Sequence, residues 1–225
     1  TVTTDSSTVV TMTNSGAAAF YTSGTYGTTT TTYQLSSGLA TIYVMDITAQ
    51  TITLTATDTN AKTGSSNVIT IVPATIDNYI VTTHTPQTAG SGWAESITAR
   101  DTHGNTVTTD SSTVVTMTNT GAALFYTDGS YNLQATTYQL TSGLATIYVM
   151  DTTAQTITLT ATDTNAKTGV SNVITIVPAG IDNYVVSAHT PQTAGLGWAE
   201  TITGRDTHGN IAVNDSSAIV TMTNT

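Results

Sequence analysis

Hydrophobic and polar side chains alternate with a period of two along several short stretches of the chain. Threonines alternate with apolar residues between positions 156 and 162, and residues 145–150 and 93–99 follow the same pattern. The run 173–177 is more apolar. Alternation at every second residue is typical of a strand with one buried face. We therefore predict strands over these four stretches, with the 173–177 strand the most covered.

Turn-forming residues separate the predicted strands. No stretch shows apolar residues at helical spacing, and threonine, valine, isoleucine and tyrosine all favour strands. About seven short strands in roughly 100 residues predict a sandwich of two sheets. The turns contain Gly, Asn or Asp and lie at residues 88–90, 103–105, 128–129, 142–143 and 165–169.

The sequence repeats itself with a period of 105 residues. Of the 74 positions in residues 1–74, 63 are identical in residues 106–179, and the segment 92–105 returns with two changes at 197–210. Six of the 11 differences fall between residues 23 and 30, which indicates an exposed segment. A period of this length matches one small domain and is too long for a solenoid repeat.

The succession of motifs resembles a known family. A DTHGN turn at Asp101–Asn105 is followed by DSSTVVTMT, SGLATIYVMD, QTITLTATDT and a closing SNVITIVPA. This order resembles a bacterial immunoglobulin-like repeat, of the kind found in tandem in invasin-like adhesins and other large surface proteins. The resemblance covers the whole chain. It implies an all-β fold of tandem immunoglobulin-like β-sandwich domains and an extracellular, bacterial-type cell-surface location.

Proline and small residues at 72–79 and 177–184 are typical of domain junctions. With boundaries there, residues 75–179 form one complete repeat. Residues 1–74 are then the C-terminal part of a preceding repeat, and residues 180–225 the N-terminal part of a following one. We expect the chain to be a section of a longer array.

Charge and composition exclude several classes of function. The chain has 14 acidic and 4 basic residues and a formal net charge of −10. So few cations cannot neutralise a nucleic-acid backbone. No apolar run is long enough to span a bilayer. The absence of cysteine excludes disulfides and thiolate-bound metals.

The histidines do not indicate an enzyme. His84 and His103 recur at positions 189 and 208, yet the chain has no GxSxG motif. We interpret them as turn and surface residues. An internal crosslink between lysine and asparagine side chains, found in some surface adhesins, requires a lysine on a buried strand. Lys62 and Lys167 lie in the TNAKTG loop, so we do not expect such a crosslink here.

Aspartate and asparagine gather in loops that the sandwich topology places at domain junctions. Carboxylate and amide oxygens are the ligands that Ca²⁺ prefers, and extracellular modules bind it weakly, at about 10⁻⁴–10⁻³ M. The alternative is that these residues only make turns, with Asp101 accepting hydrogen bonds from its own loop. The candidate calcium ligands before the central repeat are Asp46, Asp77, Asn78, Asp101, Asn105, Asp163 and Asn165, and those at the next junction are Asp151, Asp182, Asp206 and Asn210.

Two tryptophans, Trp93 and Trp198, begin the second strand of their repeats. They share a face with apolar residues such as Ile97, so we predict core positions and not sugar-stacking platforms. Glu95 lies on the same face. We expect it at the rim or paired with a polar group, because an unpartnered buried carboxylate is costly.

These features together predict a mechanical role in a stalk, fibre or surface coat that supports cell adhesion. The expected partners are neighbouring repeats, other copies of the chain, and a cell-surface or carbohydrate receptor. Two alternatives stay open. One is a filament subunit that exchanges strands between chains, and the other is a ligand-binding adhesin module, which would carry an apolar or aromatic patch specific to one repeat.

Overall fold

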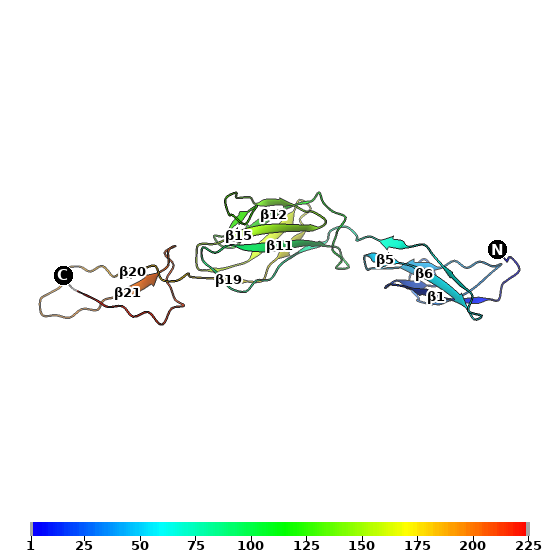
Figure 1. Ribbon diagram of the computed structural model, residues 1–225, viewed down its shortest axis with the longest axis horizontal. Helices are drawn as coiled ribbons and strands as arrows, with labels where there is room; N and C mark the ends of the chain where they lie inside the picture. Colours follow the sequence, from blue (N-terminus) through cyan, green and yellow to red (C-terminus); the bar gives the residue numbers. More distant parts are fainter. Residues whose placement is uncertain (1, 224–225) are drawn as a thin grey trace. The chain divides into compact units, whose positions relative to one another are not determined.

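A computed structural model describes residues 2–223, and these residues form strands and turns without a helix (Figure 1). The fold is all-β with its strands in a sandwich arrangement of sheets, as the alternating pattern predicts. None of the described residues belongs to a helix long and apolar enough to cross a membrane. The chain divides into two compact units, residues 1–76 with 100–109 and residues 77–99 with 110–225.

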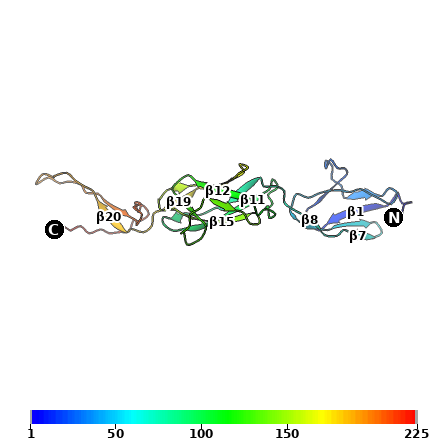
Figure 2. The ribbon, with the colours of Figure 1, turned by 90° about the horizontal axis from the view of Figure 1, so that it is seen from above.

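The second unit contains most of the complete repeat, residues 77–99 and 110–179, whereas residues 75–76 and 100–109 belong to the first unit. Its strands form one sheet in the order β13-β15-β11-β9 and another in the order β14-β12-β17-β18, with a small third sheet β10-β19-β16. Figure 2 shows these strands, in green and yellow, grouped together. β10 and β19 run parallel, whereas β15 is antiparallel to both β11 and β13, β12 to both β14 and β17, β16 to β19, and β17 to β18. The strands are β9 (Asn78–Val81), β10 (Gln87–Thr88), β11 (Trp93–Arg100), β12 (Val114–Asn119), β13 (Leu124–Tyr126), β14 (Thr137–Gln139), β15 (Leu144–Met150), β16 (Thr156–Ile157), β17 (Leu159–Asp163), β18 (Thr168–Val170) and β19 (Ile174–Val177).

Alternate residues of the central strands build the core of this repeat. Register pairs Glu95 of β11 with Ile147 of β15, and both side chains are fully buried. Trp93 is 7% exposed, so its predicted core position is confirmed. The opposite sheet contributes apolar side chains that are also inaccessible to solvent, namely Val115, Met117, Leu159 and Ala161.

Two strand predictions need correction. The stretch 156–162 is not one strand, because β16 pairs with β19 while β17 pairs with β12 and β18. The chain changes sheets at Thr158, whose amide donates a hydrogen bond to Oγ1 of Thr120 at 3.0 Å. The strand at 173–177 is covered on one face only, since Ile174 is buried while Val173 is 63% exposed.

The first unit repeats the pairings of strands β12 to β19 with a nearly identical sequence. Met12 lies opposite Ala56 in β1 and β6, as Met117 lies opposite Ala161 in β12 and β17. Its described residues include no strands equivalent to β9, so its core is less closed and Leu54 is only half-buried. The strands are β1 (Val9–Asn14), β2 (Ala19–Tyr21), β3 (Thr32–Gln34), β4 (Tyr43–Met45), β5 (Gln50–Ile52), β6 (Leu54–Asp58), β7 (Thr63–Ser65) and β8 (Ile69–Ile71).

Residues 180–223 form one antiparallel pair, β20 (Asn183–Val186) with β21 (Ile202–Arg205). The described residues after β21 add no further strand and no second sheet. Trp198 is therefore 60% exposed, and the prediction that it is a core residue is wrong for this segment.

Candidate functional site: the aspartate turns

The DTHGN turn follows β11 and is closed by backbone hydrogen bonds. The amide of Asp101 donates to the carbonyl of Asn105, and the amide of Gly104 donates to the carbonyl of Asp101, both at 3.0 Å. Gly104 has a φ of 83°, a left-handed conformation that disfavours side chains larger than hydrogen. The turn is thus fixed by its glycine and by Asp101.

The Asp101 carboxylate accepts four hydrogen bonds and is 2% exposed. Oδ1 accepts from the amides of His103 (2.9 Å) and Asn105 (2.8 Å). Oδ2 accepts from the amide of Ala74 and from Nδ2 of Asn105, both at 2.9 Å. Burial by itself raises the pKa of Asp101, but these hydrogen bonds outweigh it and lower the pKa to about 2. The carboxylate is therefore ionised across the physiological range.

Asn105 connects the turn to the preceding sequence repeat. Its Oδ1 accepts from the amide of Ala49 at 2.9 Å, and its Nδ2 donates to the carbonyl of Ile47 at 2.8 Å. Asp101 and Asn105 together hold two segments of that repeat, the loop after Asp46 and the linker at Ala74.

The second DTHGN turn has the same bonds. Asp206 accepts from the amides of His208, Asn210 and Ala179 at 2.9–3.0 Å. Asn210 accepts from the amide of Ala154 and donates to the carbonyl of Thr152. Against the effect of burial, hydrogen bonds lower the pKa of Asp206 to about 2 as well. We call these hydrogen bonds between a DTHGN turn and the preceding sequence repeat the tie. The tie therefore occurs at both copies of the turn.

The other predicted ligands also accept or donate hydrogen bonds within the protein. The carboxylates of Asp46 and Asp151 each accept two hydrogen bonds. One comes from the backbone amide two residues later in the loop, and the other from Nε2 of the glutamine four residues later. Oδ1 of Asp163 accepts from the amides of Asn165 and Lys167. Nζ of Lys167 lies 3.2 Å from Oδ1 of Asp77. Asn78 and Asn183 donate through Nδ2 to Asp77 and Asp182.

Sequence reasoning missed Tyr79 as a member of this network. Its hydroxyl donates to Oδ2 of Asp163 at 2.9 Å in the interior of the complete repeat. Burial, reinforced by the Asp163 carboxylate, raises the pKa of Tyr79 far above its ordinary value. The signal was the tyrosine in the two linker copies, IDNY at 76–79 and 181–184.

Calcium binding at these turns stays a prediction. Within residues 2–223 no group of three or more His, Asp or Glu side chains is arranged to hold a metal ion. The carboxylates of Asp101 and Asp206 already accept four hydrogen bonds each. Their observed role matches the alternative, in which aspartate closes its own turn.

The low pKa values predict how stability changes in acid. A carboxylate whose pKa is lowered by folding stabilises the fold above its unfolded pKa of about 3.8, and this contribution disappears as the pH falls towards 2. We expect the melting temperature to fall steeply between pH 4 and 2. In the double variant D101N/D206N we expect a melting temperature about 10 °C lower at pH 7 and a shallower acid decline.

Circular dichroism melts from pH 2 to 7 measure both effects. The control is D128S, which places in an exposed loop the residue found at the equivalent position, Ser23. D128S should keep most of the acid decline of the unmodified chain, because Asp128, whose pKa is also lowered by the Ser130 hydroxyl, is only one of the carboxylates involved. Identical acid profiles for the double variant and the unmodified chain would contradict the assignment.

The histidines give no catalytic arrangement in the described residues. His103 lies exposed in its turn, as predicted, whereas the ring of His84 is half-buried and not a surface group. Ser187 Oγ lies 3.3 Å from Nε2 of His189, and the same nitrogen lies 2.9 Å from Oε2 of Glu200. A proton relay needs both ring nitrogens, so this trio cannot activate the serine.

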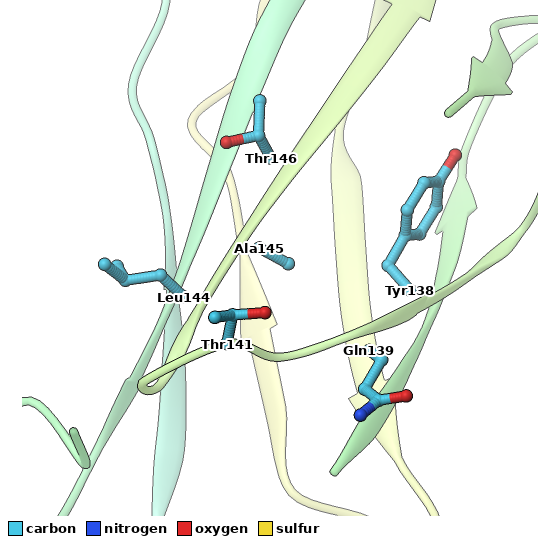
Figure 3. A pocket seen from close by; sticks show the side chains of 6 residues that line it. All are labelled: Tyr138, Gln139, Thr141, Leu144, Ala145 and Thr146. Atoms are coloured by element: carbon cyan, nitrogen blue, oxygen red, sulfur yellow. The ribbon is translucent and has the colours of Figure 1, made fainter. Parts of the chain in front are cut away.

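A shallow polar pocket lies where the chain passes from β14 to β15 (Figure 3). Thr141 and Leu144 form the bridge that turns the chain between the two sheets. The lining of the pocket includes hydroxyl and amide groups but no charged side chain. The pocket is lined by Tyr138, Gln139, Thr141, Leu144, Ala145 and Thr146.

No protein-family model and no curated protein sequence matches the chain. Among solved structures, it is similar to the D0–D1 domain of intimin (16% identity, TM-score 0.34, over 78% of this chain and 83% of that one). It is also similar to surface layer protein SbsC, domains 4–9 (15%, 0.36, over 93% and 29%), and to a β-glycosidase from Bacteroides vulgatus (12%, 0.40, over 75% and 21%). The chain thus spans less than a third of the last two, and identities and TM-scores this low assign it none of their functions.

Proposed function

We propose that this chain is a structural section of a long extracellular surface protein, which forms a stalk, fibre or coat and supports adhesion. The observation that carries the proposal is the repeated tie. At both DTHGN turns, aspartate and asparagine bind the same two segments of the preceding sequence repeat. Such a tie restricts bending at the linker, which suits a load-bearing array.

Two experiments test this function. Antibodies raised against the chain should label intact, unpermeabilised cells of the source organism, and labelling only after permeabilisation would overturn the surface location. For the tie, residual dipolar couplings should show residues 110–179 and 180–223 sharing one alignment. Variant N210A should separate the two alignments, because it removes both bonds to Thr152 and Ala154. Independent alignments in the unmodified chain would overturn the stiff array.

Calcium at the turns is retained as a separate proposal for the same residues. It would neutralise part of the formal net charge of −10. Thermal unfolding with and without a chelator tests it. A melting temperature that falls on chelation supports calcium, and an unchanged curve leaves the hydrogen bonds as the sole tie.

A second candidate function is self-assembly by strand exchange between copies. Residues buried in the complete repeat are exposed at the equivalent positions of the last segment. Trp93 is 7% exposed but Trp198 is 60% exposed, and Val81 is 4% exposed but Val186 is 46% exposed. In the complete repeat, residues 110–179 cover these side chains, and residues 5–74 are the equivalent segment of the preceding repeat. In strand exchange, residues 5–74 of a second copy would cover the exposed side chains of the last segment.

Light scattering over a range of concentrations tests strand exchange. We expect a mass that grows with concentration, a blue shift of Trp198 fluorescence on association, and a monomer for V186D. A monomer at every concentration would exclude this candidate.

The exposed loop at residues 23–30 and its counterpart at 128–135 differ most between repeats, and they are the place to seek a receptor contact.

A further inference from the structure

A carboxylate and an imidazole meet in the core of the complete repeat, away from the aspartate turns. Glu95 is fully buried in β11, and Nε2 of His84 lies 3.2 Å from its Oε2. The rings of His84 and Trp93 are 6.4 Å apart between centroids. The same trio returns at positions 189, 198 and 200, where the corresponding atoms of His189 and Glu200 are 2.9 Å apart.

The buried trio of the complete repeat lacks well-aligned hydrogen-bond partners. Four polar atoms of the trio are inaccessible to water and make no hydrogen bond of good geometry, although two of them lie 3.2 Å apart. They are Oε1 and Oε2 of Glu95, Nε2 of His84 and Nε1 of Trp93. A negative charge left in such a place is strongly disfavoured. A proton between the carboxylate and the imidazole removes that charge or pairs it.

We propose that Glu95 and His84 hold one shared proton inside the complete repeat, and that the repeat is less stable once this proton is lost. Neighbouring elements offer no substitute charge. Ile147 of β15 lies opposite Glu95, and Met117 of β12 is buried on the facing sheet. The corresponding pocket in the last segment is lined by Val186, Ser187, His189, Gln192, Trp198, Glu200 and Met222, of which only His189 and Glu200 carry ionisable side chains.

His84 is placed to exchange this proton with solvent. Its side chain is 20% exposed, in contrast to the inaccessible Glu95. Asn172 fixes its backbone, since Oδ1 accepts from the His84 amide at 2.9 Å and Nδ2 donates to the His84 carbonyl at 2.8 Å. The imidazole therefore stands between water and the buried carboxylate.

The direction of the pH effect follows from burial. Burial raises the pKa of Glu95 to about 7, and nearby donors on Thr82 and Trp93 oppose this rise only in part. A pKa raised by folding gives stability that is present at low pH and lost as the pH rises through 7. Burial lowers the pKa of His84, so its contribution is lost as the pH falls below its ordinary value of 6.5. The two contributions oppose each other below pH 6.5, so the loss due to Glu95 is unopposed between about pH 6.5 and 7, and neither contribution changes further above about pH 7.

Carbon-13 NMR of the glutamate carboxyls tests the proton directly in the unmodified chain. The chain has two glutamates, so the second serves as an internal control. We expect Glu95 to titrate with a midpoint near 7. Glu200, whose pKa is lowered chiefly by the Ser187 hydroxyl, should titrate below 4.5. A Glu95 midpoint below 5 would overturn the proposal.

Urea unfolding followed by Trp93 fluorescence, in a W198F background, tests the effect on stability. We expect the unfolding equilibrium constant to rise as the pH increases towards 7 and to level off above about pH 7, where Glu95 is ionised in both the folded and the unfolded state. E95Q should abolish this rise and the matched variant E200Q should keep it. In H84Q the unfolding equilibrium constant should begin to rise at lower pH, because Glu95 alone then binds the proton. Constant stability from pH 6 to 7.5, a rise that persists in E95Q, or an unchanged onset in H84Q would each refute proton sharing.

Discussion

Replacing Gly169 with alanine should destabilise the complete repeat by about 3 kcal/mol. Gly169 lies in β18, where a Cβ atom would overlap the carbonyl group of Tyr79 in β9. Those are backbone atoms, so relief requires β9 and β18 to separate. Separation would also strain the hydrogen bond from Tyr79 to Asp163. Urea denaturation monitored by Trp93 fluorescence measures the loss.

The repeat supplies a matched control for this substitution. Gly64 occupies the equivalent position in β7, where Ser65 follows it in place of Val170, and a Cβ atom at Gly64 would meet no atom within 4 Å. G64A should therefore be neutral or stabilise the first unit by about 0.5–1 kcal/mol, because alanine has less backbone freedom to lose. Equal small effects of both substitutions, measured by calorimetry, would show that β9 does not pack on β18 as described.

Truncating Leu159 to alanine is expected to have the second large effect, a loss of about 3–5 kcal/mol. The side chain is fully buried in β17 between the sheets, so its removal leaves a cavity in addition to the lost apolar contact. The equivalent Leu54 in β6 is half-buried. L54A should cost about 1 kcal/mol, since solvent already reaches that site.

The two leucine variants distinguish a closed core from an open one within a single chain. Calorimetry should show a lower unfolding temperature for L159A and a small change for L54A. Comparable losses at both positions would mean that the first unit buries its core as completely as the complete repeat does.

The sequence predicted the features that depend on side-chain alternation and turn chemistry. Trp93 and Ile97 are buried because they fall on one face of an alternating strand, and Asp101 closes its turn because its carboxylate lies within reach of its own loop amides. Both effects are local, so the order of residues is enough to reveal them.

The remaining features depend on contacts between residues far apart in the chain. Alternation continues through Thr158, where the strand pairing changes sheets, so the pattern could not show the break. Tyr79 and Asp163 are 84 positions apart, and nothing local links them. Trp198 has the same neighbours in sequence as Trp93, but it lacks the second sheet that covers Trp93.

The parallel pairing of β10 with β19 gives the complete repeat a particular response to tension. β10 lies near its start and β19 at its end, with Gln87 opposite Ile176 and Thr88 opposite Val177. The amide of Ala89 extends this pairing to the carbonyl of Val177. A pull on the two ends of the repeat would load these hydrogen bonds in shear, so that they must rupture together and not unzip one after another.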